Sequence, residues 1–412
     1  MAKEGGIMKQ LKVITIVGTR PEIIRLSEVM KLLDKYTEHI TVHTGQNYDY
    51  ELNEIFYKDL ELRKPDYYLG VDTSSLGKVL GETLIKFEEV LVKEKPDAVL
   101  ILGDTNASIA GIIAKRMKIP IFHMEAGNRS FDFNVPEEIN RRIIDHVADF
   151  NLVYTENSRR HLLSEGLPHR HIYVTGSPMY EVLHKNMDKI KNSKILEELG
   201  LKEKEYFIVS THREENVDNP ENLKEILNTL NMIAETYKVP VVVSTHPRTR
   251  KRLEALNSSH ITPHSSLTTP HSSLTTPHSS LTTPHSSHLT LHPLLKFLKP
   301  FGFLDYNKLQ MHAICAISDS GTISEESSML KFPAVTIRNS LERPEAMDYG
   351  SIILTGLKAN IVLNAIKIAV EEPMNFKQCP EYEVDNTSYR VLKIIMGLSG
   401  LKNRWLGINR LI

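Results

Sequence analysis

Three acidic residues, Asp104, Glu125 and Glu137, lie where their side chains could move protons to and from a carbon atom. Asp104 follows an apolar run at residues 98–102, and Glu125 follows another at residues 119–123. Because parallel strands end at one edge of their sheet, loops at successive strand ends would point these carboxylates into one cleft. Mutual repulsion and pairing with arginines separate the pKa values of such groups, as acid–base catalysis requires. A single carboxylate there is more often a helix cap or an ion-pair partner, so it is the set of three that indicates function.

Basic side chains occupy similar places. Arg20 lies in the turn Gly-Thr-Arg-Pro-Glu at residues 18–22, at the start of a helical stretch, where backbone dipole and guanidinium could hold a phosphate together. In the second half of the chain, His212 and His246 each follow a strand-like run, so they could face the same cleft from its other wall. The alternatives are a plain strand-to-helix turn with a surface arginine, and histidines that are structural.

A turn of small residues indicates the ligand class. Residues 318–326 read Ser-Asp-Ser-Gly-Thr-Ile-Ser-Glu-Glu, which predicts a strand end, a tight turn and the start of a helix. The N–H groups of such a turn can cradle a diphosphate, and a glutamate one turn into the helix can reach ribose hydroxyls. The segment lacks the glycine spacing of a dinucleotide fingerprint and the Gly-Lys-Ser/Thr ending of a P-loop. A nucleoside diphosphate is therefore favoured over NAD or ATP, and no cofactor is expected.

The segments that must position these residues alternate between short apolar runs and amphipathic stretches. Residues 11–17 form a β-branched run, and residues 23–33 carry apolar side chains at helical spacing. Further candidate strands lie at residues 40–43, 98–102, 119–123, 151–154, 171–174, 206–210, 239–244, 316–318 and 334–337. This alternation predicts an α/β fold of two doubly wound Rossmann-like domains with an interdomain cleft. We expect the domains at residues 1–180 and 181–385, with a helical segment at 386–412 that can cross back onto the first domain.

Composition excludes several other classes of protein. The 412 residues include 50 Lys and Arg against 51 Asp and Glu, so the net charge of -1 favours neither nucleic acid nor an anionic membrane surface. Two cysteines, Cys315 and Cys379, offer no disulfide framework and no metal-ligand spacing. The chain begins without the apolar run of a signal peptide and contains no stretch long enough to span a membrane. We therefore expect a cytoplasmic enzyme without a metal.

A repeat interrupts the second domain at residues 262–290. Pro-His-Ser-Ser recurs at residues 263, 270, 277 and 284, but the prolines and the Ser/Thr density are incompatible with a coiled coil. The four histidines of the repeat could form a metal-binding tract; they are His264, His271, His278 and His285. The favoured interpretation is a low-complexity loop, which a domain tolerates at small entropic cost.

Taken together and in order, the motifs resemble the non-hydrolysing UDP-N-acetylglucosamine 2-epimerases from about residue 11 to residue 370. The matching motifs are Gly-Thr-Arg-Pro-Glu at 18–22, Thr-Gly-Gln at 44–46, Gly-Asp-Thr at 103–105, Glu-Ala-Gly at 125–127, Pro-Glu-Glu-x-Asn-Arg at 136–141, Thr-His-Arg-x-Glu-Asn at 211–216, Asp-Ser-Gly at 319–321, Glu-Glu at 325–326 and Glu-Arg-Pro-Glu at 342–345. The resemblance implies a GT-B-like fold whose second domain holds most of the UDP.

The resemblance also implies roles for individual residues. Ser320 and Gly321 would bind the diphosphate, Glu326 the ribose, and Tyr306 would lie near the uracil. The predicted catalytic residues are Asp104, Glu125, Glu137 and His212. The predicted substrate-binding residues are Arg20, Arg25, Gln46, Arg141, His246, Tyr306, Ser320, Gly321, Thr322, Glu326 and Arg343.

The chemistry of such a reaction suits these residues. The hydrogen at C-2 of a UDP-sugar has no adjacent carbonyl, so simple enolisation is not available. One route oxidises a neighbouring hydroxyl with NAD, but no dinucleotide fingerprint is present. The resemblance implies the other route, which eliminates UDP across C-1 and C-2 to give a glycal and adds UDP back after protonation on the opposite face. This route needs a base, an acid and cationic support for the departing diphosphate. Which carboxylate is base and which is acid stays open.

Departures from the commonest family pattern point to a subgroup. They are Arg25 in place of Lys, Asn128 in place of Leu, Glu214 in place of Arg, Thr322 in place of Gly, and Ser177-Pro178 after Thr-Gly. They resemble the enzymes that convert UDP-2-acetamido-2,6-dideoxy-L-talose to UDP-N-acetyl-L-fucosamine. The near alternatives are UDP-N-acetylglucosamine and a UDP-diacetamido-uronic acid as substrate.

Two other classes of protein remain as alternatives. A GT-B glycosyltransferase would bind UDP in the same way but would not need the three carboxylates. A scaffold that uses the repeat for recognition is the weakest alternative. Relatives of the resembled family suggest a homodimer, and a surface polysaccharide as the destination of the product.

Overall fold

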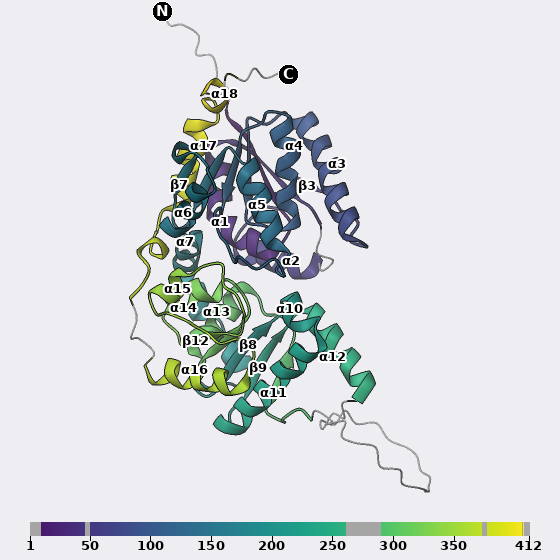
Figure 1. Ribbon diagram of the computed structural model, residues 1–412, viewed down its shortest axis with the longest axis vertical. Helices are drawn as coiled ribbons and strands as arrows, with labels where there is room; N and C mark the ends of the chain where they lie inside the picture. The colour runs from purple at the N-terminus through teal and green to yellow at the C-terminus, as the bar shows by residue number, and fades with distance from the viewer. Residues whose placement is uncertain (1–9, 46–49, 261–289, 373–376, 406, 408–412) are drawn as a thin grey trace, which may run out of the picture.

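The protein is a computed structural model, which describes residues 10–45, 50–260, 290–372, 377–405 and 407. Two lobes are stacked along the long axis, with the first half of the chain in the upper lobe and the second half in the lower lobe (Figure 1). Each lobe contains one parallel sheet between helices, so the predicted fold class of two doubly wound, GT-B-like domains is confirmed.

In the described part of the chain, seven parallel strands form the sheet of the first domain, in the order β3-β2-β1-β4-β5-β6-β7. The strands are β1 (Lys12–Val17), β2 (Glu38–His43), β3 (Tyr67–Tyr68), β4 (Ala98–Leu102), β5 (Ile121–Met124), β6 (Phe150–Val153) and β7 (Ile172–Val174). The helices of this domain are α1 (Arg20–Tyr36), α2 (Tyr50–Asp59), α3 (Leu76–Glu94), η1 (Asn106–Ala110), α4 (Gly111–Arg116), α5 (Glu137–Val147), α6 (Glu156–Ser164) and η2 (His169–His171). Strand order reverses between β1 and β4, the switch point at which such sheets bind ligands.

The sheet of the second domain has the order β10-β9-β8-β11-β12-β13, so its switch point lies between β8 and β11. Its strands are β8 (Phe207–Thr211), β9 (Val241–Thr245), β10 (Leu295–Leu298), β11 (Ala316–Ser318), β12 (Ala334–Thr336) and β13 (Ile353–Leu354). The helices from the linker onward are α7 (Pro178–Lys185), α8 (Met187–Asn192), α9 (Ile195–Glu198), α10 (Glu214–Val217), α11 (Pro220–Tyr237), α12 (Pro247–His260), α13 (Phe303–His312), α14 (Ile323–Leu330), α15 (Glu345–Asp348), α16 (Ala359–Glu371), η3 (Pro380–Tyr382), α17 (Thr387–Leu398) and α18 (Lys402–Trp405).

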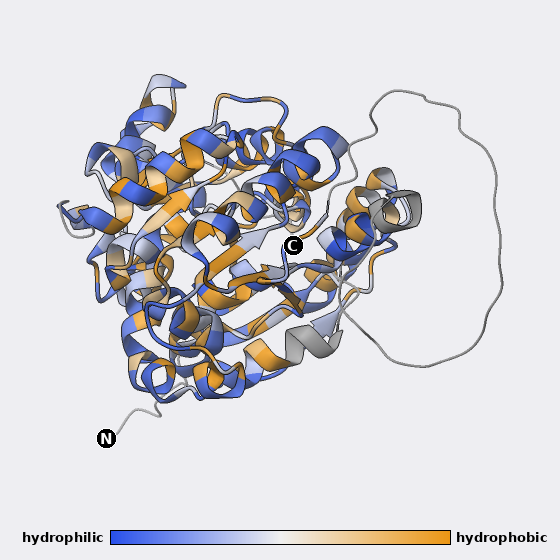
Figure 2. Cartoon of the chain, turned by 90° about the horizontal axis from the view of Figure 1, so that it is seen from below, coloured by the Kyte–Doolittle hydropathy of each residue, from blue (hydrophilic) through white to orange (hydrophobic). Residues whose placement is uncertain are grey.

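Buried apolar side chains on both faces of each sheet hold the strands in place. In the first domain α1 and α17 cover one face, and α3, α4 and α5 cover the other. In the second domain α11 and α16 cover one face, and α9, α13 and α14 cover the other. Hydrophobic residues accordingly lie on the strands and the inward sides of the helices (Figure 2). Burial on both faces explains why most strands read as unbroken apolar runs.

The chain returns to the first domain after α16. Helix α17 buries Val391, Leu392 and Ile395 in the core beside α1, so it completes the first domain although it follows the second (Figure 1). A further apolar cluster joins the domains, with Phe56 of α2, Val182 of α7 and Met329 of α14 among its members. These contacts fix the two switch points at facing edges.

The strand predictions were correct for most elements, with ends shifted by one or two residues. The candidate list lacked β3 and β13, which have two residues each, and β10, which has four. Helix α1 begins at Arg20 rather than Ile23, because Thr19 and Glu22 form a capping box around its first turn. In the described residues, none of the helices is long and apolar enough to cross a membrane.

Candidate active site

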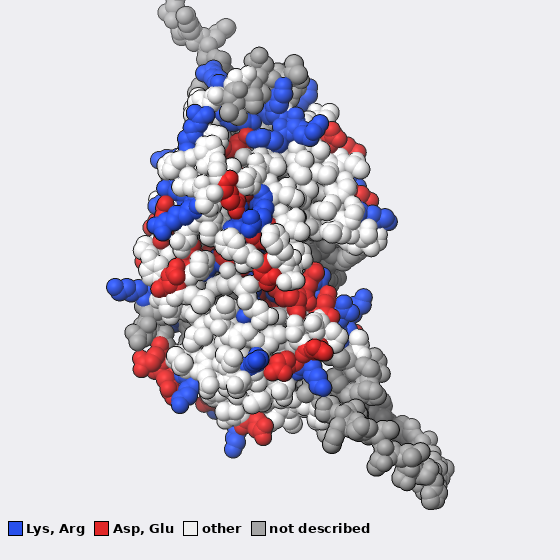
Figure 3. Space-filling view, viewed as in Figure 1, with Lys and Arg blue, Asp and Glu red and all other residues white. Residues whose placement is uncertain are grey.

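The predicted site residues that the structure describes lie in the loops and helices that follow β1, β4, β5, β8, β9, β11 and β12, except Tyr306, which lies on α13. The space-filling view shows acidic side chains gathered along the waist between the lobes, with the right-hand outline indented there (Figure 3). The two domains therefore present their strand ends, and the side chains beyond them, to each other.

Asp104 is held by a buried arginine. Arg141 on α5 donates from Nε and Nη2 to the same oxygen of Asp104, at 2.9 and 2.5 Å. The other guanidinium nitrogen, Nη1, donates to Glu138 at 3.0 Å. Arg141 thus orients Asp104 from beneath, and Oδ1 of Asp104 is left without a hydrogen bond to any described residue.

Glu125 occupies a conformation that is uncommon for a side-chain-bearing residue. It follows β5 with a φ of 64°, in the left-handed region that costs about 1 kcal/mol or more outside glycine. Tyr154 donates to one carboxylate oxygen at 3.2 Å, and Arg343 of the second domain donates to the other at 2.5 Å. Arg25 lies 3.6 Å from the first oxygen. Both oxygens of Glu125 are therefore fixed by cationic or hydroxyl donors.

Glu137 differs from the other two carboxylates. It is the first residue of α5, and its partly buried side chain makes no hydrogen bond or ion pair with any residue that the structure describes. Its charge acts on the guanidinium of Arg213 in the second domain and helps to raise the pKa of that group. Glu137 therefore faces the other domain with both oxygens open.

A network of buried ion pairs crosses between the domains beside Glu125. Arg25 of α1 forms an ion pair with Glu325 of α14, and Arg343 donates to the same carboxylate at 2.9 Å. The Glu325 side chain is 0% exposed, and its arginine partners lower its pKa against the opposing effect of burial. Ser177, in the linker after β7, also donates to Glu325 at 2.5 Å. Arg25 is thus placed by protein carboxylates.

The turn at residues 18–22 differs from the prediction for a phosphate-binding turn. Glu22 folds back and accepts from the N–H groups of Gly18 and Thr19, at 2.9 and 2.6 Å. Its other oxygen accepts from the Thr105 hydroxyl at 2.9 Å. The backbone part of the prediction was therefore wrong, because a carboxylate of the chain already occupies the helix N-terminus.

Arg20 nevertheless lies in the predicted neighbourhood. The rings of His212 and His246 lie 5.8 Å apart, and the charge of Arg20 lowers the pKa of both. Burial is the largest cause for each histidine, and it lowers the pKa of His246 to about 4. His212 also forms a 3.3 Å contact through Nδ1 with Asp319. Two neutral imidazoles and a guanidinium thus converge from both domains, and an incoming anion would favour protonation of the imidazoles.

Asp319 fixes the turn before α14 to the loop after β8, and the Gly321 N–H of this turn is left without an acceptor among the described residues. Buried Asp319 accepts from the backbone N–H groups of His212 and Arg213, and from the side chains of Thr211 and Asn216. In the turn itself, the Ser320 and Thr322 hydroxyls lie 3.0 Å apart.

Close packing explains the glycine at position 321. An added Cβ would lie 2.7 Å from Oε1 of Glu342 and 3.5 Å from Nη2 of Arg213. Contacts below 3.0 Å force the neighbours to move, and here the neighbours form a buried ion pair at 3.1 Å. The turn therefore requires glycine for close approach rather than for a special φ angle.

Tyr306 and Glu326 lie together beneath this turn. Burial is the largest cause that raises the pKa of each group. The charge of Glu326 raises the pKa of Tyr306 further. Gln310 donates to Glu326 at 3.0 Å, and the Tyr306 hydroxyl lies within hydrogen-bonding range of Ser210. Both predicted nucleotide-binding side chains thus belong to the second domain.

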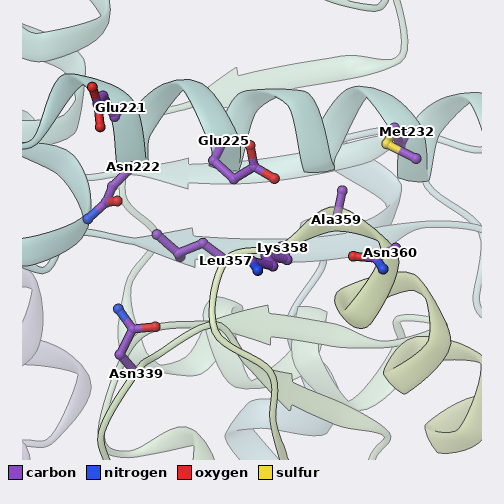
Figure 4. Close-up of a pocket in the computed structure, with 9 residues that line it drawn as sticks. All are labelled: Glu221, Asn222, Glu225, Met232, Asn339, Leu357, Lys358, Ala359 and Asn360. Atoms are coloured by element: carbon purple, nitrogen blue, oxygen red, sulfur yellow. The ribbon is translucent and has the colours of Figure 1, made fainter.

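Several predictions fall elsewhere. Gln46 and the repeat up to residue 289 lie outside the described residues. Searched over the described ranges, the structure contains no group of three or more residues that could hold a metal ion. A groove of about 670 Å³ between α11 and the start of α16 contains none of the predicted residues (Figure 4). Its lining includes Glu221, Glu225 and Lys358.

Sequence reasoning missed some members of the network. Glu325 and Glu342 lie within the matching motifs, each directly before a predicted residue, Glu326 or Arg343. That position in the sequence was the signal that could have identified them. Tyr154 and Asp319 also hold predicted residues in place. Tyr154 ends an apolar run and carries no signal of its own, because its partners Arg25 and Glu125 are distant in the chain.

Comparisons with known proteins give the class. A family model described as UDP-N-acetylglucosamine 2-epimerase matches residues 31–396. The solved UDP-N-acetylglucosamine 2-epimerase of Rickettsia bellii is 45% identical, with a TM-score of 0.83 over 96% of this chain and 100% of that chain. The Methanocaldococcus jannaschii UDP-GlcNAc 2-epimerase in complex with UDP-GlcNAc and UDP is 32% identical, with a TM-score of 0.82 over 94% and 100%. The UDP-2,3-diacetamido-2,3-dideoxy-D-glucuronate 2-epimerase of Pseudomonas aeruginosa is 31% identical over 87% of this chain and 92% of its own length.

The fold, the facing loops and these matches define an enzyme of the isomerase class. The chain belongs to the UDP-N-acetylglucosamine 2-epimerase family.

Proposed function

We propose that the protein inverts C-2 of a UDP-linked N-acetylated amino sugar by elimination and re-addition of UDP. The observation that carries this proposal is the contact of Arg343 with both Gly321 and Glu125, at 2.8 and 2.5 Å. It joins the turn suited to a diphosphate to a carboxylate suited to proton transfer. An enzyme that breaks the bond between UDP and C-1 while it removes the hydrogen on C-2 needs these two groups side by side.

The two half-reactions balance without a redox cofactor. A carboxylate removes the C-2 proton, the electron pair forms the C-1–C-2 double bond, and the C-1–oxygen bond breaks with its electrons going to UDP. A proton then adds to C-2 on the opposite face, and a phosphate oxygen of UDP attacks C-1. Asp104, Glu125 and Glu137 supply the acid–base groups, and all three lie on the first domain.

As UDP departs, negative charge builds up on its diphosphate, and cationic groups nearby must stabilise it. Arg20, His212 and His246 converge from both domains and are the groups we assign to this role. Because the pKa of His246 is about 4, it is neutral before the ligand binds, and a nearby diphosphate would favour its protonation. Stabilisation of a leaving group in a closed site is commonly worth several kcal/mol.

For the substrate, we propose UDP-2-acetamido-2,6-dideoxy-β-L-talose, with UDP-N-acetyl-β-L-fucosamine as product. Arg25, Asn128 and Thr322 support this choice, because they depart from the commonest family pattern beside the residues of the site. A pocket that does not bind an O-6 hydroxyl can accept a 6-methyl sugar. UDP-N-acetylglucosamine is the second candidate, favoured by the names of the Rickettsia bellii and Methanocaldococcus jannaschii relatives.

Proton NMR in D2O, without added NAD, tests the reaction and the substrate together. Conversion of the talo sugar to the fuco isomer with deuterium at C-2 is the expected result. Exchange on UDP-N-acetylglucosamine alone would keep the mechanism and change the substrate. Absence of exchange on both sugars, and on UDP-2,3-diacetamido-2,3-dideoxy-D-glucuronate, would reject the epimerase and favour a GT-B glycosyltransferase.

We also propose a homodimer, on the basis of an exposed apolar face of the first domain. Ile85 on α3 is 60% exposed and Ile139 on α5 is 51% exposed. Phe131 and Phe133, in the loop before α5, are each 66% exposed. The Arg142 guanidinium of α5 lies over the rings of Phe131 and Phe133, 5.8 and 5.4 Å from their centroids. Exposed apolar side chains gathered on one face commonly bind a partner, here a second copy. Light scattering should give twice the chain mass for the wild type and less for Ile85→Glu; a monomeric wild type would reject the proposal.

We propose a cytoplasmic location on the chemistry of the cysteines. Cys315 and Cys379 are both buried free thiols, which suits a reducing compartment. Fractionation of cells that produce the protein, followed by immunodetection, tests this assignment, and recovery with the membranes would contradict it.

A further inference from the structure

Arg343 makes contacts that a residue dedicated to substrate binding would not make. Nη1 donates to the Gly321 carbonyl oxygen at 2.8 Å and to Glu325 at 2.9 Å, while Nη2 donates to Glu125 at 2.5 Å. The side chain is only 6% exposed. Both terminal nitrogens are thus engaged by protein oxygens, one in the turn before α14 and one in the other domain.

Glu125 depends on this contact for its orientation. Its backbone has a φ of 64°, and the only first-domain hydrogen bond to its carboxylate in the described structure comes from Tyr154, at 3.2 Å. A single hydrogen bond leaves rotation about the side-chain torsions possible. The second oxygen is fixed by Arg343, which lies in a loop of the second domain.

We propose that Arg343 is a positioning residue: it makes the orientation of the Glu125 carboxylate depend on the turn at Gly321, where the proposed function places the diphosphate. A shift of this turn moves the Gly321 carbonyl, the guanidinium follows it, and Glu125 follows the guanidinium. The carboxylate is then aligned for proton transfer only when the two domains and the turn are in their closed arrangement. The inference rests on the proposed function, because it assumes that UDP binds at this turn.

The arrangement has a chemical purpose. Elimination of UDP leaves a glycal that would be lost if proton transfer were possible without the second domain in place. A carboxylate aligned by the diphosphate turn performs its step only while UDP is held, which keeps both halves of the substrate together. A misplacement of about 1 Å in such a group can lower the rate by about 10²-fold.

Arg343→Gln and Arg343→Lys test the proposal in the full-length enzyme. The rate of deuterium incorporation at C-2 and the Kd for UDP, by calorimetry, are measured for each variant. For Arg343→Gln we expect kcat to fall about 10²-fold, with the Kd for UDP within about threefold of wild type. Arg343→Lys keeps the charge but cannot bridge two acceptors with a planar fork, so kcat should fall about tenfold.

Glu325→Gln is the matched control, because it weakens the interdomain ion pairs of Glu325 with Arg343 and Arg25 and keeps the contact between Arg343 and Glu125. We expect a lower thermal midpoint and a fall in kcat several times smaller than that of Arg343→Gln. An equal fall in both variants, or a loss of UDP affinity parallel to the loss of kcat, would overturn the positioning role. Unchanged kcat in Arg343→Lys would also overturn it, even if Arg343→Gln does not fold. Lack of exchange in the wild type would instead reject the proposed function.

Discussion

Two strand-to-helix turns, one in each domain, lie beside the switch points and differ in what occupies their N–H groups. At the start of α1, the Glu22 carboxylate accepts from Gly18 and Thr19, so the turn is closed by the chain itself. At the start of α14, the N–H groups of Ser320 and Thr322 donate to the hydroxyls of Ser318 and Ser320, at 3.0 and 3.3 Å, and Asp319 accepts from the backbone N–H of His212. Among the described residues, no carboxylate accepts from this turn and the Gly321 N–H has no acceptor. The second turn therefore keeps one N–H for an anion, whereas Glu22 closes the first.

This difference separates the duties of the domains. The first domain presents carboxylates and an arginine, which act through side chains. The second presents backbone N–H groups and two histidines, suited to a diphosphate. Under the proposed function, proton transfer and nucleotide binding lie on opposite sides of one interface, and variants on each side should fail in different ways.

The largest expected effect comes from the open carboxylate of the first domain. Glu137→Gln should lower kcat for deuterium incorporation about 10³-fold, because it removes an acid–base group whose two oxygens are both free to approach the substrate. Its Kd for UDP should stay within about twofold of wild type. Glu214→Gln is the control, since Glu214 is an exposed carboxylate of the second domain paired with Arg248. Comparable kcat losses in the two variants would contradict the division between domains.

The closed turn of α1 should show itself in the pH dependence of stability. Burial raises the pKa of Glu22 from 4.5 to about 7, so between these values the folded chain binds more protons than the unfolded chain. The contribution of Glu22 is therefore fully present below pH 4.5 and is lost as pH rises to 7, by about 3 kcal/mol. Glu22→Gln removes this dependence, and its thermal midpoint relative to wild type should rise from pH 5 to pH 7. A constant difference would show that Glu22 does not keep the raised pKa.

The turn at the start of α1 also illustrates which features the sequence predicts and which it does not. Alternating apolar runs sufficed for two parallel sheets, because strands buried on both faces leave an unbroken signal. Strands β3 and β13 left none, since two residues carry no period and pair only through their neighbours. The candidate site was predicted as a set of strand ends. The pairing of Arg25 with Glu325, 300 residues apart, and the return of Glu22 onto its own helix follow from packing that local patterns do not encode.

The open turn of α14 should be sensitive to a single methyl group. Gly321→Ala places a Cβ 2.7 Å from Oε1 of Glu342, so the turn or the carboxylate must shift. A shift that moves the Gly321 N–H away from the diphosphate should weaken UDP binding by about 2 kcal/mol, or about thirtyfold in Kd. Gly81→Ala on α3 is the matched control, because nothing lies within 4 Å of its added Cβ. Unchanged UDP affinity in Gly321→Ala would place the diphosphate elsewhere.

The smallest effect is expected when the repeat is replaced. This replacement tests whether the site is confined to the interface between the domains. Helix α12 begins directly after His246 and has 14 residues, so its far end lies about 20 Å from that histidine, and the repeat follows this end. Replacing residues 262–289 with a short Gly-Ser linker keeps Thr290, whose carbonyl accepts from Asn231 at 2.8 Å. Both kcat and the Kd for UDP should stay within about twofold. A folded but inactive replacement would mean that the repeat, and not only the two facing turns, takes part in function.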